Sequence, residues 1–261
     1  MSASSATKRR VAIVTGGLTG IGLAAARALA ERGHHIAVGS RQGGDAGASE
    51  DARKALGDDA MIAPLDVASQ TSIDAFCAAV RDRFGPIGIL VNAAGIYHEA
   101  FLADHSDSNW TNQVDINLTG PFRMTRAVWP DMIAAGWGRV ANVASTAGSV
   151  GAAGYAAYCA SKAGVIGLSK ATAVEGAPHG INCIALSPTW IETPMMDNAV
   201  TRIAASNAMT EDEARARIEK SNPQGRFVQP AEVASIIDFF CTDASLALTN
   251  VDIQVNAGAL W

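Results

Sequence analysis

The stretch Val11-Ala-Ile-Val-Thr-Gly-Gly-Leu-Thr-Gly-Ile-Gly22 decides the fold. Its apolar start, 11–14, is typical of a short strand that is buried on both faces. The glycines that follow let the chain turn sharply into a helix, predicted over 20–32. Free N–H groups at the start of such a helix can hold a phosphate. The spacing Gly-x-x-x-Gly-x-Gly fits a dinucleotide site, although glycines can also serve turn geometry alone.

Short apolar runs alternate with helical patterns along the rest of the chain. Further strands are predicted at 35–38, 61–65, 89–91, 139–143, 182–186 and 251–255, and helices at 72–84, 109–135, 156–175 and 231–241. This alternation predicts an α/β fold: a single Rossmann-like, doubly wound domain with a seven-stranded, mostly parallel sheet and helices on both faces.

The domain is expected to span 10–261, after a flexible tail at 1–9. The stretch 190–227 is long for a connection and carries its own helical pattern. Long insertions of this kind often form lids over active sites. We therefore expect a substrate lid there, with a plain surface excursion as the alternative.

Composition excludes several classes of protein. The 261 residues carry a net charge of −5 and no basic face, so nucleic acid is not an expected partner. No stretch is long and apolar enough to predict a membrane span. The four cysteines, Cys77, Cys159, Cys183 and Cys241, form no Cys-x-x-Cys pair, so we expect no metal site. Reduced thiols are typical of a cytoplasmic protein.

The end of the second strand bears on the choice of cofactor. An acidic residue there would bind the ribose of NAD, but the chain has Gly39-Ser40-Arg41. A hydroxyl and a guanidinium match a 2′-phosphate, which favours NADP(H) over NAD(H). The alternative is that Arg41 is a solvated loop charge, in which case NAD(H) remains the candidate.

Tyr158 and Lys162 share one face of a predicted helix, because they are four residues apart. A free phenol has a pKa of about 10, and a nearby cation is expected to lower it. Such a tyrosine can act as a general acid or base. Ser145 follows the fifth strand, at the sheet edge where ligands bind, although a turn serine is the commoner case.

Taken together, these motifs resemble the short-chain dehydrogenase/reductase family. Thr15-Gly16, Asn92-Ala-Ala-Gly95, Asn117, Ser145 and Tyr158-x-x-x-Lys162 occur in that family's order and cover nearly the whole chain. The resemblance implies that Ser145, Tyr158 and Lys162 are catalytic, and that Asn117 binds a water that relays protons through Lys162. It is strongest toward ketone and 3-oxoacyl reductases, including polyketide ketoreductases.

The expected cofactor residues lie at the glycine turn, after the strands that follow it, and in the catalytic helix. They are Gly16, Leu18, Thr19, Gly20, Ile21, Gly22, Ser40, Arg41, Asp66, Val67, Asn92, Ala93, Gly95, Tyr158, Lys162, Pro188, Ile191 and Thr193. The expected substrate residues are Tyr97, His98, Tyr155, Trp190 and Met195. No Arg or Lys falls in the three segments 97–98, 146–155 and 190–196, so we expect a neutral ketone or secondary alcohol.

Two other functions remain open from the sequence. One is an NAD-dependent secondary-alcohol or hydroxyacid dehydrogenase, and the other is a cofactor-binding sensor without catalysis. Intact catalytic side chains favour an enzyme over a sensor. The resemblance also implies a homotetramer built on the long helices, and it leaves open whether an acyl substrate is free or held on coenzyme A or a carrier protein.

Overall fold

All seven strands of the computed structural model, which describes residues 8–259, lie parallel in one sheet. Their spatial order is β3-β2-β1-β4-β5-β6-β7. The strands are β1 (Val11–Thr15), β2 (His35–Ser40), β3 (Met61–Pro64), β4 (Ile87–Asn92), β5 (Gly138–Val143), β6 (Ile181–Pro188) and β7 (Val251–Val255). This confirms the predicted Rossmann-like class. Of the tail predicted at 1–9, residues 1–7 lie outside the described part.

The strand side chains divide between two apolar cores. In β1, Ala12 and Val14 belong to one core, and Val11 and Ile13 belong to the other. Alternate residues of a strand point to opposite faces, so a strand with helices on both sides must be apolar throughout. Every residue of β1 is buried. Burial on both faces therefore explains why the strand segments of the sequence are apolar throughout and do not alternate with polar residues.

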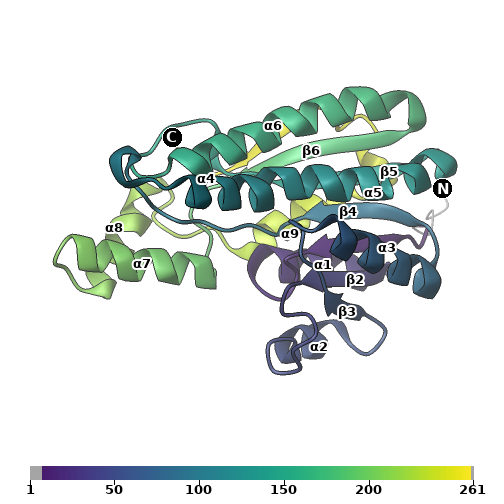
Figure 1. Ribbon diagram of the computed structural model, residues 1–261, viewed down its shortest axis with the longest axis horizontal. Helices are drawn as coiled ribbons and strands as arrows, with labels where there is room; N and C mark the ends of the chain where they lie inside the picture. The colour runs from purple at the N-terminus through teal and green to yellow at the C-terminus, as the bar shows by residue number, and fades with distance from the viewer. Residues whose placement is uncertain (1–7, 260–261) are drawn as a thin grey trace, which may run out of the picture.

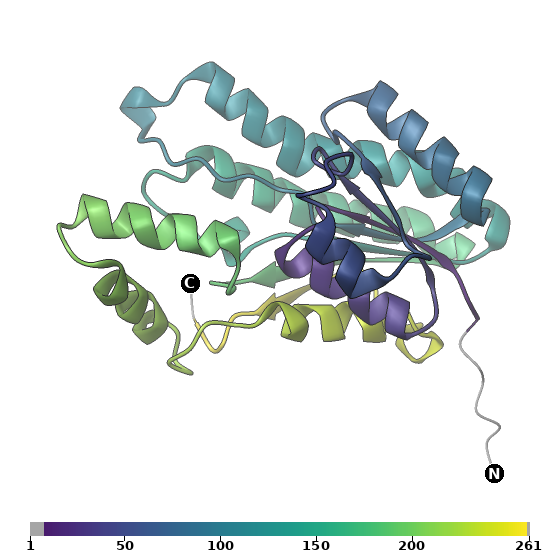
Figure 2. The ribbon, with the colours of Figure 1, turned by 90° about the horizontal axis from the view of Figure 1, so that it is seen from below.

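Helices cover both faces of the sheet, as Figures 1 and 2 show. One core contains side chains of α1 and α9, and the other contains side chains of α3, α5 and α6. The helices are α1 (Gly20–Glu31), α2 (Glu50–Leu56), α3 (Gln70–Phe84), α4 (Asp107–Val114), α5 (Gly120–Ala135), α6 (Ala156–Gly176), α7 (Pro194–Ser206), α8 (Glu211–Ser221) and α9 (Pro230–Phe240). Three layers result, with the sheet in the middle.

The winding of the chain reverses between β1 and β4. β1 pairs with β2 on one side and with β4 on the other, so the connections leave the sheet in opposite directions. In open parallel sheets a crevice lies at such a reversal, outside the carboxyl ends of the strands. The loops that follow β1, β4, β5 and β6 all begin at this edge.

The segment predicted as a helix over 109–135 is helical throughout, but it contains a π turn that the sequence did not predict. Two α-helices, α4 and α5, are joined by a π-helical turn over Asp115–Thr119. An inserted π turn shifts the side chains that follow it and is frequent at functional sites. Its signature is a hydrogen-bond register, which apolar periodicity does not reveal. α2 also went unpredicted, because its seven residues carry only one buried side chain, Ala52.

Within 190–227 the chain forms two helices, α7 and α8, which project beyond the carboxyl edge of the sheet (Figure 1). The four cysteines are free thiols. Within residues 8–259, no helix is long and apolar enough to cross a membrane. The same residues contain no cluster of three or more metal-ligating side chains.

His34 makes the stability of this fold depend on pH. Its side chain is 4% exposed, and its Nδ1 accepts a hydrogen bond from the Arg10 backbone N–H at 3.1 Å. Burial, assisted by the charge of Arg32, lowers the pKa of His34 to about 4. The unfolded chain therefore binds a proton at His34 more readily than the folded chain does. Stability falls as pH drops through the interval between the two pKa values of His34.

As pH falls from about 6.5 to about 4, we expect protonation of His34 to lower the free energy of unfolding by about 3 kcal/mol at most. Urea unfolding of the wild type and of His34→Asn over that range measures it, because asparagine keeps an acceptor for Arg10 and does not titrate. Equal pH slopes in the two proteins would show that His34 is not responsible.

Candidate active site

Ser145 lies directly after β5, at the first residue of a tight turn. Its hydroxyl accepts a hydrogen bond from the backbone N–H of Ala147 at 3.1 Å, which caps the short helical turn Thr146–Gly148. The side chain of Ser145 also lines the same cavity as Tyr158 and lowers the pKa of that tyrosine in part. Ser145 is therefore both a turn serine and a partner of the predicted proton donor, and the turn holds it in place.

Lys162 stands one helical turn after Tyr158 in α6. Its side chain is nearly buried, and its Nζ donates to the carbonyl oxygen of Val143 at 2.8 Å. The Nζ lies 5.6 Å from the centre of the Tyr158 ring. Val143 is the last residue of β5, so the strand end positions the ammonium group beside the tyrosine.

The pKa of Tyr158 shifts in the direction opposite to the one expected from the sequence. Burial raises it to about 12, although the hydrogen bond with Ser145 lowers it in part. Burial also lowers the pKa of Lys162 to about 8. The expected lowering of the Tyr158 pKa by Lys162 was wrong here, because desolvation of a phenolate outweighs a cation at this distance. Tyr158 consequently keeps its proton at neutral pH.

Asn117 faces inward from the π turn. Its Oδ1 accepts from the backbone N–H of Ile96 at 2.8 Å, and its Nδ2 donates to the Ile96 carbonyl at 2.9 Å and to Ser161 Oγ at 3.2 Å. These bonds tie the segment after β4 to the catalytic helix α6. A water relay through Asn117 stays a prediction, while its positioning of Ile96 is a feature of the structure.

The glycine turn after β1 forms a cradle too tight for side chains. A Cβ on Gly16 would lie 2.8 Å from the backbone of Ala94, and one on Gly22 would lie 2.4 Å from the carbonyl oxygen of Gly16. Gly16 also has a φ of +66°, which favours glycine. Thr19 precedes α1 but makes no side-chain cap to it. These features fit a pyrophosphate on the first turn of α1.

Two cavities meet at Gly95, beside this cradle. The first, of about 180 Å³, contains three of the four predicted catalytic side chains, all but Asn117, and most of the expected nicotinamide and substrate positions. Its expected members are Ile21, Ala93, Gly95, Tyr97, Ser145, Tyr155, Tyr158, Lys162, Pro188, Trp190, Ile191, Thr193 and Met195. The second is lined by Gly16, Ser40, Arg41, Asp66, Val67 and Gly95 among the expected cofactor residues.

Some expected residues lie outside both cavity walls. Leu18, Thr19, Gly20 and Gly22 belong to the glycine turn and α1, and Asn92 is buried in the sheet, where its amide donates to Asn142 at 2.8 Å. His98 differs from expectation, because its side chain is exposed and does not line either cavity. Its backbone is held by Gln113 instead.

The sequence reasoning also missed residues that the fold brings to the first cavity. Val143, Ala144, Thr189 and Ala199 line it. Val143 ends β5 and Ala144 links it to Ser145, and their place beside a predicted catalytic residue was a usable signal. Ala199 comes from α7, and an alanine on a helix carries no sign of a site.

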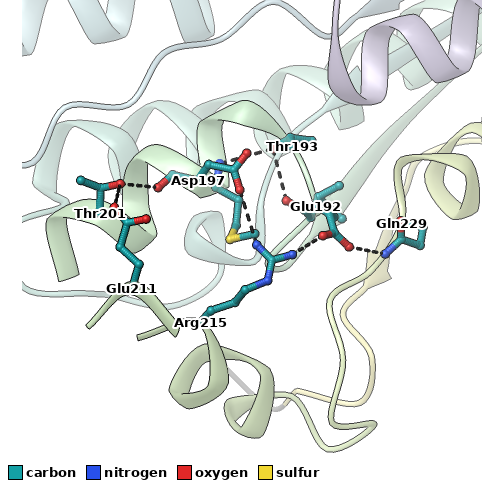
Figure 3. A network of polar contacts seen from close by, with 9 residues as sticks. Glu192, Thr193, Asp197, Thr201, Glu211, Arg215 and Gln229 are labelled. Atoms are coloured by element: carbon teal, nitrogen blue, oxygen red, sulfur yellow. Dashed lines mark hydrogen bonds and ion pairs between the residues drawn. The ribbon is translucent and has the colours of Figure 1, made fainter. Parts of the chain in front are cut away.

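A polar network holds the lid segment together (Figure 3). Arg215 of α8 pairs with Glu192 and with Asp197. Glu192 in turn accepts from the side chain of Gln229 at 2.8 Å, at the start of α9. The network therefore joins α7, α8 and the body of the domain around Thr193, a residue of the cavity wall.

Comparison with known proteins identifies the family of this chain. The model of the short chain dehydrogenase family matches residues 10–204. The chain belongs to the short-chain dehydrogenase family. It is 41% identical over 251 residues, 95% of this chain and 96% of the relative, to a protein of Streptomyces virginiae named as a ketoacyl reductase of the monensin polyketide synthase.

Two further similar proteins show that relatives of this chain carry different enzyme names. The D-beta-hydroxybutyrate dehydrogenase of Cupriavidus necator is 34% identical, with 97% of this chain and 95% of the relative covered. The actinorhodin polyketide ketoreductase, solved with NADPH, has a TM-score of 0.91 at 38% identity and covers 96% of this chain and 97% of that one. The chain is therefore an oxidoreductase whose relatives include ketoacyl reductases.

Tyr158→Phe is expected to lower turnover by about 10²- to 10⁴-fold, because it removes the proposed proton donor and keeps the ring. Steady-state rates with a nicotinamide cofactor measure the loss, and cofactor affinity is expected to change little. Tyr155→Phe is the matched control, because the ring of Tyr155 stacks on that of Tyr97 in the same cavity, with ring centres 4.7 Å apart. This variant is expected to keep most activity. Near-normal rates for a folded, cofactor-binding Tyr158→Phe protein would refute the assignment.

Proposed function

We propose that this protein is an NADPH-dependent ketoreductase that acts on ketones, including those of the 3-oxoacyl type. One observation carries the proposal. The side chains of Ser145 and Tyr158 lie together on the wall of a cavity that meets a second cavity at Gly95. A carbonyl oxygen bound between the two hydroxyls would place its carbon beside the expected nicotinamide position.

A bound nicotinamide supplies hydride to the carbonyl carbon. Negative charge then develops on the oxygen, where the Tyr158 hydroxyl donates its proton and the Ser145 hydroxyl donates a hydrogen bond. Burial raises the pKa of Tyr158 to about 12, so the group holds the proton that this step needs. Lys162, held by Val143, contributes positive charge beside the tyrosine as the proton leaves.

The test of this function is consumption of NADPH, followed by its absorbance, with a panel of ketones. Turnover of ketones by the wild type supports the proposal. NAD(H)-dependent oxidation of secondary alcohols or hydroxyacids, without NADPH-dependent reduction, would favour the dehydrogenase alternative. Absence of turnover with either cofactor, in a protein that binds it, would favour a sensor.

The second cavity supports NADPH over NADH. Ser40 and Arg41 line it together, at the end of β2 where a 2′-phosphate is expected. The one carboxylate on its wall, Asp66, already accepts a hydrogen bond from the backbone N–H of Ala68 at 2.9 Å. The NADPH-bound actinorhodin ketoreductase is consistent with this preference.

Arg41→Ala is expected to weaken NADPH binding by about 1.5–3 kcal/mol, the value of a hydrogen bond to a charged group, and to leave NADH binding nearly unchanged. Titration of both cofactors against the wild type and the variant measures this. Arg53→Ala, on the exposed side of α2, serves as a control for loss of a nearby positive charge. Equal weakening of both cofactors by Arg41→Ala would contradict the NADPH assignment.

Exposed apolar side chains support the proposed homotetramer. Trp110 of α4 and Phe122 of α5 are each 44% exposed, and Val174 of α6 is 65% exposed. α4, α5 and α6 lie along one side of the molecule (Figure 1). Apolar groups of this size gain free energy when another subunit covers them.

Light scattering is expected to give the mass of four chains at micromolar concentration. The double variant Trp110→Asp/Phe122→Asp is expected to reduce that mass, because burying two carboxylates in an apolar contact is unfavourable. A monomeric wild type would refute the proposed assembly and leave the chemistry untouched.

A further inference from the structure

Glu192 differs from its neighbours in the wall of the catalytic cavity. Every other residue of the segment 188–193 lines that cavity, and Glu192 does not. Its side chain is 43% exposed, pairs with Arg215 of α8 and accepts a hydrogen bond from Gln229 Nε2 at 2.8 Å (Figure 3). Its backbone N–H donates to the carbonyl oxygen of Val228 at 3.0 Å. The outer side of this wall is therefore fastened twice, once through the backbone and once through the Glu192 carboxylate.

Arg215 contacts two carboxylates at once. One end of its guanidinium pairs with Glu192, and its Nη1 lies 3.5 Å from Oδ1 of Asp197, in the first turn of α7. The guanidinium also lies over the ring of Phe227, with its central carbon 4.8 Å from the ring centre. An isolated exposed ion pair contributes little, whereas a planar guanidinium in a network of several contacts can hold a defined geometry. Arg215 therefore bridges the end of a loop and the start of a helix.

Thr193 lies between these two carboxylates in the sequence and faces the cavity. It is the N-cap of α7, and its hydroxyl accepts a hydrogen bond from the backbone N–H of Met196 at 3.4 Å. A Cβ on Gly20 would lie 3.0 Å from Cγ2 of Thr193. Gly20 is the first residue of α1, where the pyrophosphate of a dinucleotide is expected. Thr193 therefore packs directly against the glycine turn.

We propose that Arg215 is a positioning residue for the nicotinamide half of the cofactor. By holding Glu192 and Asp197, it keeps Thr193 against the glycine turn, so this wall is in place before the cofactor binds. A wall ordered in advance loses less conformational entropy on binding, which raises affinity. Arg215 itself lines neither of the two cavities formed by residues 8–259, so it acts through its neighbours. The inference rests on the nicotinamide cofactor of the proposed function and not on its substrate.

The two cavities predict which part of the cofactor depends on Arg215. The first cavity contains Thr193 beside Tyr158, where the nicotinamide is expected. The walls of the second, as residues 8–259 form them, include Ser40 and Arg41 but no residue of the segment 190–227. A ligand that occupies the second cavity alone does not reach Thr193. Its affinity is therefore expected to be independent of Arg215.

Binding of two ligands, measured by calorimetry, tests the proposal. One is NADPH, and the other is adenosine 2′,5′-bisphosphate, which carries the 2′-phosphate but lacks the nicotinamide half. We expect Arg215→Met to raise the Kd of NADPH by about three- to tenfold, the effect of losing a partly exposed network of two ion pairs. The Kd of the bisphosphate is expected to change by less than about twofold, because its site is remote from Thr193.

Partner variants show whether Arg215 acts through Glu192. Glu192→Gln removes the paired charge and is expected to raise the Kd of NADPH in the same way. The double variant is expected to bind no more weakly than Arg215→Met, because both changes remove one shared contact. Arg215→Lys is expected to be intermediate, since an ammonium keeps the charge but lacks the planar fork. Arg217→Met, also on α8, is the matched control, because Arg217 donates to Asn207 instead.

Salt gives a readout that a purely apolar packing role of Arg215 would not move. We expect the ratio of the NADPH Kd of Arg215→Met to that of the wild type to approach one at about 1 M salt, where charges about 3 Å apart are already screened. The same ratio for Arg217→Met is expected to stay near one at low and at high salt. A ratio for Arg215→Met that does not change with salt would show that its charge is not responsible.

Two other results would overturn the proposal. One is an unchanged Kd of NADPH in both Arg215→Met and Glu192→Gln, the second of which replaces the first if that protein does not fold. The other is an equal weakening of NADPH and the bisphosphate, which means a general change in the fold. If the wild type binds NADH in place of NADPH, the NADPH assignment fails, and NADH with AMP tests Arg215 in the same way. Because binding is measured without turnover, a protein that reduces no ketone contradicts the proposed function and leaves this test intact.

Discussion

Parallel strands can be joined only by crossovers, and this constraint places every strand's carboxyl end at one edge of the sheet. The rest of the molecule depends on it. The glycine turn after β1, the segment after β4, Ser145 after β5 and Pro188 at the end of β6 meet at that edge although they are far apart in sequence. Reversal of the winding at β1 and β4 then leaves space between the loops. The crevice is a result of connectivity, and the side chains that line it supply its chemistry.

Burial decides the electrostatics of the catalytic group. Taking Tyr158 out of water penalises its phenolate, and taking Lys162 out of water penalises its ammonium, so the pKa of Tyr158 rises while the pKa of Lys162 falls. Both groups are held by backbone or hydroxyl partners that cannot titrate in the same range, Val143 and Ser145. The neutral, protonated tyrosine that results is suited to giving a proton to an oxygen on which charge is developing. The same arrangement disfavours a permanent phenolate.

The predicted lid, residues 190–227, is attached to the domain by contacts that differ from those of the loops lining the crevice. Within the segment, Arg215 pairs with Glu192 and a small apolar cluster joins α7 to α8, while Gln229 at the start of α9 donates a hydrogen bond to Glu192. Exposed ion pairs of this kind contribute little free energy. Arg202 of α7 adds a contact with the ring of Tyr97, its guanidinium carbon lying 4.6 Å from the ring centre.

Local signals in the sequence determined the α/β class, most of the strands, the glycine turn and the trio Ser145, Tyr158 and Lys162, since each depends on neighbours within a few residues. Long-range packing alone decided the rest. The π turn that directs Asn117 inward depends on a hydrogen-bond register that periodicity does not record. The direction of the Tyr158 pKa shift depends on how much water the folded chain excludes. Arg202 reaches Tyr97, more than a hundred residues earlier, only because α7 folds over the sheet edge, and no spacing along the chain encodes that contact.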